Sequence, residues 1–225
     1  TAIKAAVDQL DVAFGGNVNN KLYFGLGLGI SILTYNYEST FNEIDNIDTS
    51  QDFQNYTSSS FLRSTGLGVN AKFGLIYRPV SWFRIGASYQ MPTFNSVTEN
   101  YRVDINAVYD SSYYQNSLSS FPVKYKFRTP MKGVLSASFF IKENGFFSVD
   151  YEVQNFGSSR YNFGNGYEQF STNINTSIKK YYVFNHTIRA GFEGAYKTFR
   201  GRVGYSYSTS PYKKEFAFKR FFRGF

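Results

Sequence analysis

The sequence predicts an all-β protein, a transmembrane antiparallel β-barrel, and three observations lead to this prediction. Large apolar residues alternate with glycine or polar residues in several long segments, as in KLYFGLGLGISI at residues 21–32. A period of two indicates strands with two unlike faces. Aromatic residues make up 20% of the 225 residues, which favours strands. No run of about 18 apolar residues occurs, which excludes a transmembrane helix but leaves the short alternating segments of a barrel.

The alternation predicts about eight long strands. Their alternating segments lie at residues 10–14, 22–32, 67–77, 83–91, 135–141, 147–153, 184–192 and 203–207. Short turns are expected at 17–20, 78–81, 142–145 and 196–200, and long polar loops at 42–60, 95–120 and 157–180. Short turns at one end and long loops at the other are typical of outer-membrane barrels.

Three local features refine this plan. The apolar parity changes after Ile32, which predicts a bulge or a departure from the membrane at that point. Phe170, Ile174 and Ile178 are four residues apart, which predicts a short amphipathic helix within residues 168–182 at the outer end. Tyrosine and tryptophan near the strand ends, such as Tyr77 and Trp82, match an interfacial aromatic girdle.

A soluble lipocalin-like barrel or sandwich is the alternative to a membrane barrel. Its polar face would meet water and would normally carry lysine, glutamate and threonine. The polar parity here carries glycine more often than charge, although glycine weakens a strand. Glycine that faces a lumen leaves room for other side chains or allows tight curvature of the strand. The membrane barrel is therefore the preferred interpretation, with the large side chains of residues 22–32 facing lipid.

Composition and short motifs exclude several other functions. The sequence has no cysteine, which removes disulfides and thiolate sites. The formal net charge is +8, but the basic residues are spread singly, so nucleic-acid binding is not expected. GLGLG at 25–29 lacks the spacing of a dinucleotide fingerprint. No signal peptide is visible in TAIKAAVDQL, so it was removed or the chain begins mid-protein.

Charged residues of the polar parity are the first candidate site. They are expected to face the lumen: Lys72, Arg84, Lys132, Asp150, Glu152, Arg189, Glu193 and Arg202. One interpretation is a ladder of structural ion pairs, since charges inside a barrel must be paired or hydrated. The other is a transport path in which a cation attracts a carboxylate ligand. Asp150 and Glu152, two residues apart on one strand face, could also be a glycosidase pair, but nothing nearby supplies the rest of such a site, so catalysis is not expected.

Aromatic residues of one polar stretch are the second candidate site. Tyr109, Tyr113, Tyr114 and Phe121 lie in VYDSSYYQNSLSSF at residues 108–121 and are expected either to capture a hydrophobic ligand outside the cell or to belong to an ordinary external loop. His186 lies on the apolar parity and is expected at the membrane boundary. Without cysteine or a second histidine, neither a metal site nor a cofactor is expected.

Three segments resemble the FadL/TodX family of outer-membrane transporters from Gram-negative bacteria. They are GLGVNAKFGLIYRPVSWFRIGASYQMPTF (66–94), FRTPMKGVLSASFFIKENGFFSVDYEVQNF (127–156) and RAGFEGAYKTFRGRVGYSYSTSP (189–211). The resemblance implies a barrel of about fourteen strands with an N-terminal plug. Residues 1–225 are therefore expected to form a single barrel domain that is an internal portion of a larger barrel, without the plug. The ending FKRFFRGF finishes in phenylalanine, as outer-membrane barrels often do.

The resemblance also implies a function. We expect an outer-membrane channel for hydrophobic small molecules such as long-chain fatty acids, with membrane lipid, lipopolysaccharide and the hydrophobic ligand as partners. The alternative is a FadL-like barrel that binds proteins of a secretion system or another outer-membrane complex and moves no solute. A barrel lipase would need serine, histidine and an acid, or Ca²⁺, and His186 lies on the wrong face for this. No enzyme activity is expected.

Overall fold

The computed structural model describes residues 1–45, 52–142 and 144–216, which form one antiparallel sheet of twelve strands with a single α-helix. The strands are β1 (Ala2–Val18), β2 (Leu22–Ile44), β3 (Phe53–Val80), β4 (Phe83–Gln90), β5 (Phe94–Tyr109), β6 (Tyr113–Ser119), β7 (Val123–Arg128), β8 (Lys132–Phe140), β9 (Gly145–Asn155), β10 (Arg160–Asn162), β11 (Phe184–Tyr196) and β12 (Phe199–Ser208). The helices are η1 (Phe156–Ser158, 3-10) and α1 (Glu168–Tyr181). In these described ranges no helix has the length and apolarity needed to cross a membrane.

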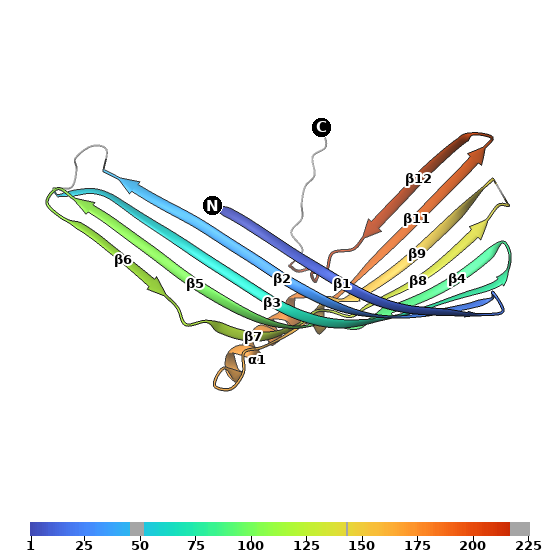
Figure 1. Cartoon of the computed structure of the whole chain (residues 1–225), viewed down its shortest axis with the longest axis horizontal. Helices are drawn as coiled ribbons and strands as arrows, with labels where there is room; N and C mark the ends of the chain where they lie inside the picture. Colours follow the sequence, from blue (N-terminus) through green and yellow to red (C-terminus); the bar gives the residue numbers. More distant parts are fainter. Residues whose placement is uncertain (46–51, 143, 217–225) are drawn as a thin grey trace. The chain divides into compact units, whose positions relative to one another are not determined.

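The chain divides into two compact units. Unit 1 contains residues 1–9, 31–68 and 95–126, and unit 2 contains residues 10–30, 69–94 and 127–225. The strand order is β10-β7-β5-β3-β4-β8-β9-β11-β12, with β2 between β1 and β3 and with β6 beside β5. In unit 2, strands β4, β8, β9, β11 and β12 follow one another across the sheet (Figure 1).

The turns of unit 2 agree with the sequence prediction. Asn19 and Asn20 join β1 to β2 with positive φ angles of 53°, the left-handed conformation that asparagine tolerates in tight hairpin turns. Lys197 makes the β11–β12 turn and also has a φ of 53°. A two-residue turn at Ser81 and Trp82 joins β3 to β4. Of the expected turn at 142–145, residue 143 lies outside the described residues.

The prediction that residues 95–120 form a loop was wrong, as was the strand count of eight. β5 and β6 pair antiparallel in unit 1, from Arg102 opposite Ser119 to Val108 opposite Tyr113. Val103, Ile105 and Ala107 alternate with polar residues in this segment, a short strand signal that its polar composition masked. Residues 53–60 of the expected loop at 42–60 also belong to a strand, and residues 46–51 lie outside the described ones.

Strand β2 shows what the change of parity after Ile32 means. No break occurs, because β2 runs on to Ile44. Alternation of exposure is clear up to this point, with Ser31 only 4% exposed between exposed Ile30 and Ile32. From Leu33 to Tyr37 every residue is half-buried instead. The sequence signal therefore marks the end of a two-faced surface and not the end of the strand.

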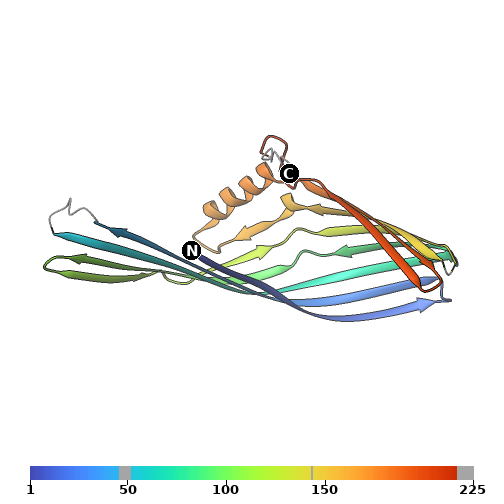
Figure 2. The same cartoon turned by 90° about the horizontal axis from the view of Figure 1, so that it is seen from above.

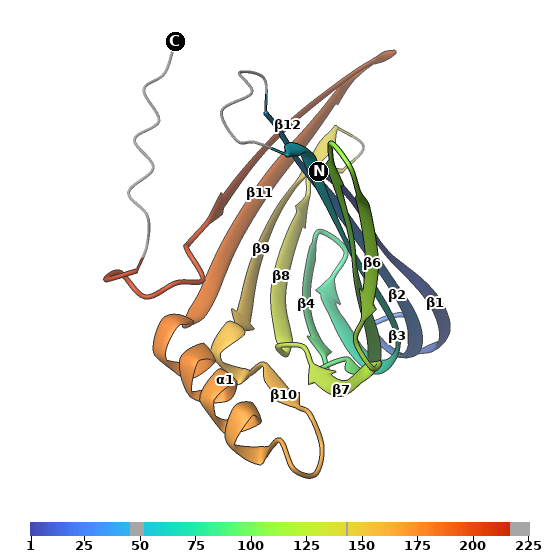
Figure 3. The ribbon, with the colours of Figure 1, turned by 90° about the vertical axis from the view of Figure 1, so that its left-hand side faces the viewer.

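The predicted amphipathic helix is confirmed as α1, which packs beside β10 in unit 2 (Figures 2 and 3). Asn175 of α1 holds β10 with both ends of its amide. Its Oδ1 accepts a hydrogen bond from the backbone N–H of Tyr161, and its Nδ2 donates to the Tyr161 carbonyl, each at 2.8 Å. Ser171, the one buried residue of α1, accepts a hydrogen bond from the Phe163 N–H. The helix is thus fixed to the segment that precedes it.

Candidate functional site: the two faces of the barrel wall

Burial in this structure is the reverse of that in a water-soluble protein. Among the described residues, one hydrophobic side chain, Val97, is buried, whereas eight polar residues are. Large apolar side chains are exposed in long rows instead. Soluble proteins rarely expose contiguous apolar surface of this extent. A strand protein with apolar residues outside and polar residues inside is built for contact with lipid.

The apolar face of unit 2 includes a shallow groove. The large residues predicted to face lipid are exposed there, for example Phe24, Leu28 and Leu135 at 53%, 54% and 58%. The groove has a volume of about 560 Å³ and passes over Ala87 and Gly133, whose small side chains leave space between larger neighbours. Sequence reasoning missed it, although these two small residues interrupt otherwise large apolar rows.

Ion pairs occupy the polar face of β9, β11 and β12. Arg189 Nη1 lies 3.0 Å from Glu152 Oε2, on the neighbouring strand. Glu193 receives two arginines, Arg202 at 2.5 Å and Arg200 at 3.9 Å. Both carboxylates are well covered, with 14% of each side chain exposed. Covered carboxylates need such partners, because burial without one would be costly.

A glycine makes room for the ion pair at the other edge of unit 2. Lys72 Nζ of β3 reaches Asp11 of β1 at 2.9 Å, although β2 lies between these strands. Gly27 of β2 lies beneath this connection, and a Cβ placed on it would be 3.7 Å from the Cβ of Lys72. Sequence analysis had named Lys72 but not Asp11, since nothing local indicates a partner two strands away.

Three of the eight candidate charges make no ion pair within the described part of the chain: Arg84, Lys132 and Asp150. Arg84 lies with its guanidinium 4.4 Å from the ring centre of Phe140, a cation–π contact. Asp150 is directly opposite Arg189 in the strand register, yet that arginine pairs with Glu152. These three charges are therefore the ones available to a ligand.

The polar face of unit 1 is closely packed. Ser31 Oγ of β2 donates to Asn95 Oδ1 of β5 at 3.4 Å, across Gly68 of β3. Both side chains are buried, at 4% and 7% exposure. Ser64 donates a second hydrogen bond on this face, to Glu99 Oε2 at 2.9 Å. The face thus holds a hydrogen-bond network and not an apolar core.

The aromatic residues of the second candidate site lie on the β5–β6 hairpin. The rings of Tyr109 and Tyr114 meet edge to face at 5.7 Å, and Phe53 of β3 lies 5.9 Å from Tyr109. Tyr113 and Phe121 are exposed, Phe121 at 93%. The structure therefore brings two of the four candidates into ring contact, whereas the Tyr113 hydroxyl donates a hydrogen bond to Asn106 Oδ1 at 3.2 Å.

A second aromatic cluster, which the sequence analysis missed, lies beside α1 in unit 2. Phe127 stacks on Tyr161 with ring centres 4.6 Å apart, Tyr161 is 6.3 Å from Phe163, and Phe163 meets Phe170 of α1 edge to face at 4.9 Å. We call these four residues the α1 cluster. Phe127 is distant in sequence from the others, and only the fold could show that it joins them.

A tyrosine pair stands at the other end of α1. The Tyr182 hydroxyl donates a hydrogen bond to the Tyr212 hydroxyl at 3.4 Å. This bond, together with partial burial and the proximity of Tyr212 and Tyr161, raises the pKa of Tyr182 above the usual 10.0. On the apolar face, the Tyr151 hydroxyl and His186 Nδ1 are 2.6 Å apart. No group of three or more acidic or histidine side chains in the described residues is arranged to hold a metal ion.

These features together define part of the wall of a transmembrane β-barrel, with apolar side chains on the lipid-facing surface and polar groups on the other. Three solved structures share the fold. They are the toluene transporter TbuX from Ralstonia pickettii (TM-score 0.61, 15% identity), the monoaromatic hydrocarbon channel CymD (0.57, 16%) and a deltaS2S3 mutant of the monoaromatic hydrocarbon channel TodX (0.57, 13%). The resemblance to FadL/TodX transporters is thereby confirmed at the level of the fold.

The match covers most of this chain but only part of the solved ones. It includes 93%, 93% and 90% of this chain and 57%, 61% and 54% of TbuX, CymD and the TodX mutant. The chain thus spans little more than half the length of these transporters. No protein-family model and no curated sequence matches it.

Proposed function

We propose that this chain is part of a channel that takes up small hydrophobic molecules across the outer membrane of a Gram-negative bacterium. The observation that carries the proposal is an exposed apolar face opposite a polar one, on a sheet with the fold of solved hydrocarbon transporters. A polar interior gives a passage through the membrane that lipid does not fill.

Aromatic side chains offer the first contact for such a solute. The α1 cluster and the Tyr109–Tyr114 pair are half-exposed or exposed stacks of rings outside the alternating strand segments. Such stacks bind apolar and aromatic molecules by burial and by ring–ring contacts, each worth about 0.5–1.5 kcal/mol beyond the area buried. Each of the two stacks therefore supports contact with a hydrophobic solute.

The finer question is whether the solute carries a carboxylate. A fatty acid would need a cation on the polar face, and Arg84 and Lys132 are the two candidate cations without an ion pair among the described residues. A neutral hydrocarbon would need neither. Long-chain fatty acids and monoaromatic hydrocarbons are therefore distinguishable by these two residues. We propose the uncharged class, because the solved structures that share the fold are a toluene transporter and monoaromatic hydrocarbon channels.

The test is uptake in cells that lack the gene and carry the full-length protein or its Arg84→Gln/Lys132→Gln variant. We expect the wild type to restore uptake of labelled toluene and the variant to match it. Loss of oleate uptake alone in the variant, about tenfold for one lost charged contact, would show that the fatty acid is the substrate. A matched control, Lys21→Gln/Lys197→Gln, removes two charges from the short turns. Equal uptake of every hydrophobic solute with and without the gene would overturn the proposal.

A further inference from the structure

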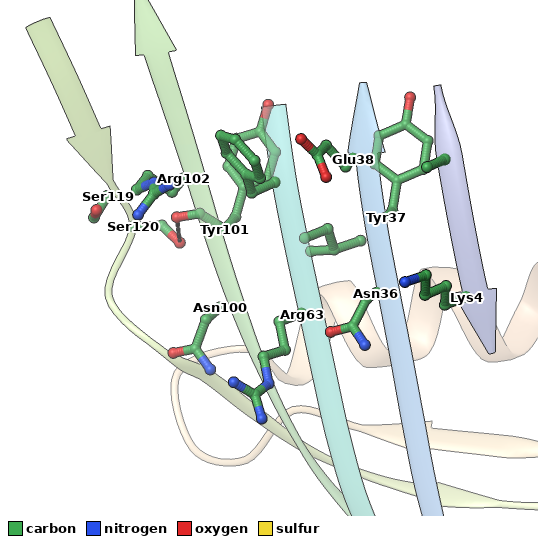
Figure 4. A pocket seen from close by; sticks show the side chains of 13 residues that line it. Lys4, Asn36, Tyr37, Glu38, Arg63, Asn100, Tyr101, Arg102, Ser119 and Ser120 are labelled. Atoms are coloured by element: carbon green, nitrogen blue, oxygen red, sulfur yellow. Dashed lines mark hydrogen bonds between the residues drawn. The ribbon is translucent and has the colours of Figure 1, made fainter. Parts of the chain in front are cut away.

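A polar groove of about 560 Å³ crosses five strands of unit 1 (Figure 4). Its polar lining includes Lys4 of β1, Asn36 of β2, Arg63 of β3, Asn100 and Arg102 of β5, and Ser119 of β6. These strands are neighbours in the sheet, in the order β1, β2, β3, β5, β6. The groove is therefore formed by residues far apart in sequence and by the pairing of the β5–β6 hairpin with the long strands.

The groove lies on the face of unit 1 that also carries the exposed apolar side chains Ile32 and Leu67. In β3, Ser64, Gly66 and Gly68 turn toward the polar network, since Ser64 bonds Glu99 and Gly68 lies under Asn95. Arg63 and Leu67 alternate with them and are exposed on the opposite face. Leu67 is apolar and 57% exposed. Arg63 precedes it by four residues, which is about 13 Å along the strand.

The same change from apolar to polar occurs on β2. Ile32 is 53% exposed on this face, and Asn36 and Glu38 occupy the equivalent positions four and six residues later. Along β2 and β3 the groove thus begins about 13 Å from Ile32 and Leu67, which are exposed apolar side chains on the same face. In a lipid bilayer this is the level of the head groups and of the sugars attached to them.

The groove has spare positive charge. Three basic residues and one carboxylate, Glu38, line it. Arg102 is engaged, because it pairs with Asp104 at 3.1 Å and covers the ring of Phe61 at 4.6 Å. Lys4 and Arg63 make no ion pair or side-chain hydrogen bond within the described part of the chain. Amide and hydroxyl groups beside two free cations are the donors that phosphorylated sugars require.

We propose that this groove binds the phosphorylated sugars of a lipopolysaccharide molecule whose acyl chains contact the exposed apolar side chains Ile32 and Leu67 of unit 1. Lys4 and Arg63 contact the phosphate groups, and Asn36, Asn100 and Ser119 contact sugar hydroxyls. The inference rests on the outer-membrane location of the proposed function but not on the solute that is transported. Free phosphate offers the same chemistry without the acyl chains, so the test must separate the two sources.

The experiment measures binding to the full-length protein in phosphatidylcholine nanodiscs, by native mass spectrometry with added short-core lipopolysaccharide. The test variant is Lys4→Gln/Arg63→Gln, and Arg63→Lys is the conservative variant. The matched control, Lys21→Gln/Lys214→Gln, removes two charges that do not line the groove. We expect about tenfold weaker binding for the test variant, and binding close to the wild type for Arg63→Lys and the control.

Two outcomes would overturn the proposal. Equal lipopolysaccharide binding by the wild type and the test variant would show that the groove is not the site. Displacement of lipopolysaccharide by millimolar inorganic phosphate would show a simple anion site instead. Binding is measured without transport. If the wild-type protein does not take up toluene, the proposed function is refuted, but the measured lipopolysaccharide binding still stands.

Discussion

Gly68 is a position on the polar face of unit 1 where one added methyl group should disturb the packing strongly. A Cβ added there would lie 2.1 Å from Asn95 Oδ1 and 2.5 Å from Ser31 Oγ. Real contacts of this kind are not shorter than about 3.0 Å, so Gly68→Ala must displace the Asn95 amide. The two side chains that it separates are buried and share a hydrogen bond.

The magnitude follows from three contributions. Alanine is better than glycine in a strand by about 0.5–1 kcal/mol because it loses less backbone entropy. Separating the buried partners costs about 1–3 kcal/mol, since each loses its hydrogen bond away from water. Crowding a packed site costs about 1–3 kcal/mol more. We therefore expect Gly68→Ala to lower the free energy of unfolding by about 2–4 kcal/mol.

Gly74 provides the matched control, because it lies on the same strand and the same face and a Cβ there would meet nothing within 4 Å. Gly74→Ala should leave stability unchanged or raise it by about 0.5–1 kcal/mol. The assay is urea unfolding of the full-length protein in lipid vesicles, and the double variant Gly68→Ala/Asn95→Ala should recover most of the loss. Equal stability of the two single variants would refute the reasoning.

Three further predictions concern unit 2. Arg189→Gln should lower the free energy of unfolding by about 1–3 kcal/mol in the same assay, because it strands the covered carboxylate of Glu152. Tyr212→Phe should lower the pKa of Tyr182, which ultraviolet titration of the phenol can follow. The folded chain keeps a proton that the unfolded chain releases above pH 10.0, so stability falls as pH rises through this range, and the variant should show a smaller fall. Asn175→Ala should lose both hydrogen bonds to β10 and reduce hydrogen-exchange protection of α1 by about 1–2 kcal/mol, whereas unchanged protection would contradict the assignment.

The elements that sequence could predict are those whose signal is local. The row from Phe24 to Ile32 alternates strictly, and each large side chain of it that was expected to face lipid is exposed. The spacing of Phe170, Ile174 and Ile178 likewise predicted a helix within residues 168–182, and α1 ends one residue earlier, at Tyr181. A period of 2 or 3.6 is a property of neighbouring residues, so it can be read without knowing what lies opposite.

The elements that sequence could not predict depend on partners distant in the chain. β5 has a short alternating row of Val103, Ile105 and Ala107 among polar residues, and β6 has no such row, so the pairing of β5 with β3 and β6 is what identifies both as strands. The alternation of residues placed Asp150 and Glu152 on one face of the strand, but it could not tell which of them would bind Arg189. The choice depends on the register between β9 and β11, and on the length of the arginine side chain, which reaches diagonally to Glu152. Partner choice is a tertiary property.

The glycines of KLYFGLGLGISI can now be given a specific role. In each unit a polar side chain reaches a partner two strands away, and the strand between them has a glycine at the crossing. Lys72 reaches Asp11 across Gly27 in unit 2, and Asn95 reaches Ser31 across Gly68 in unit 1. A larger residue at the crossing would occupy the space of the connecting side chain. At Gly68 a Cβ would overlap Asn95 and Ser31, whereas at Gly27 it would make an ordinary contact with Lys72, so glycine is a steric requirement at the Gly68 crossing only. Side-chain links between alternate strands help to fix their positions without an apolar core, while the opposite face stays free to meet lipid.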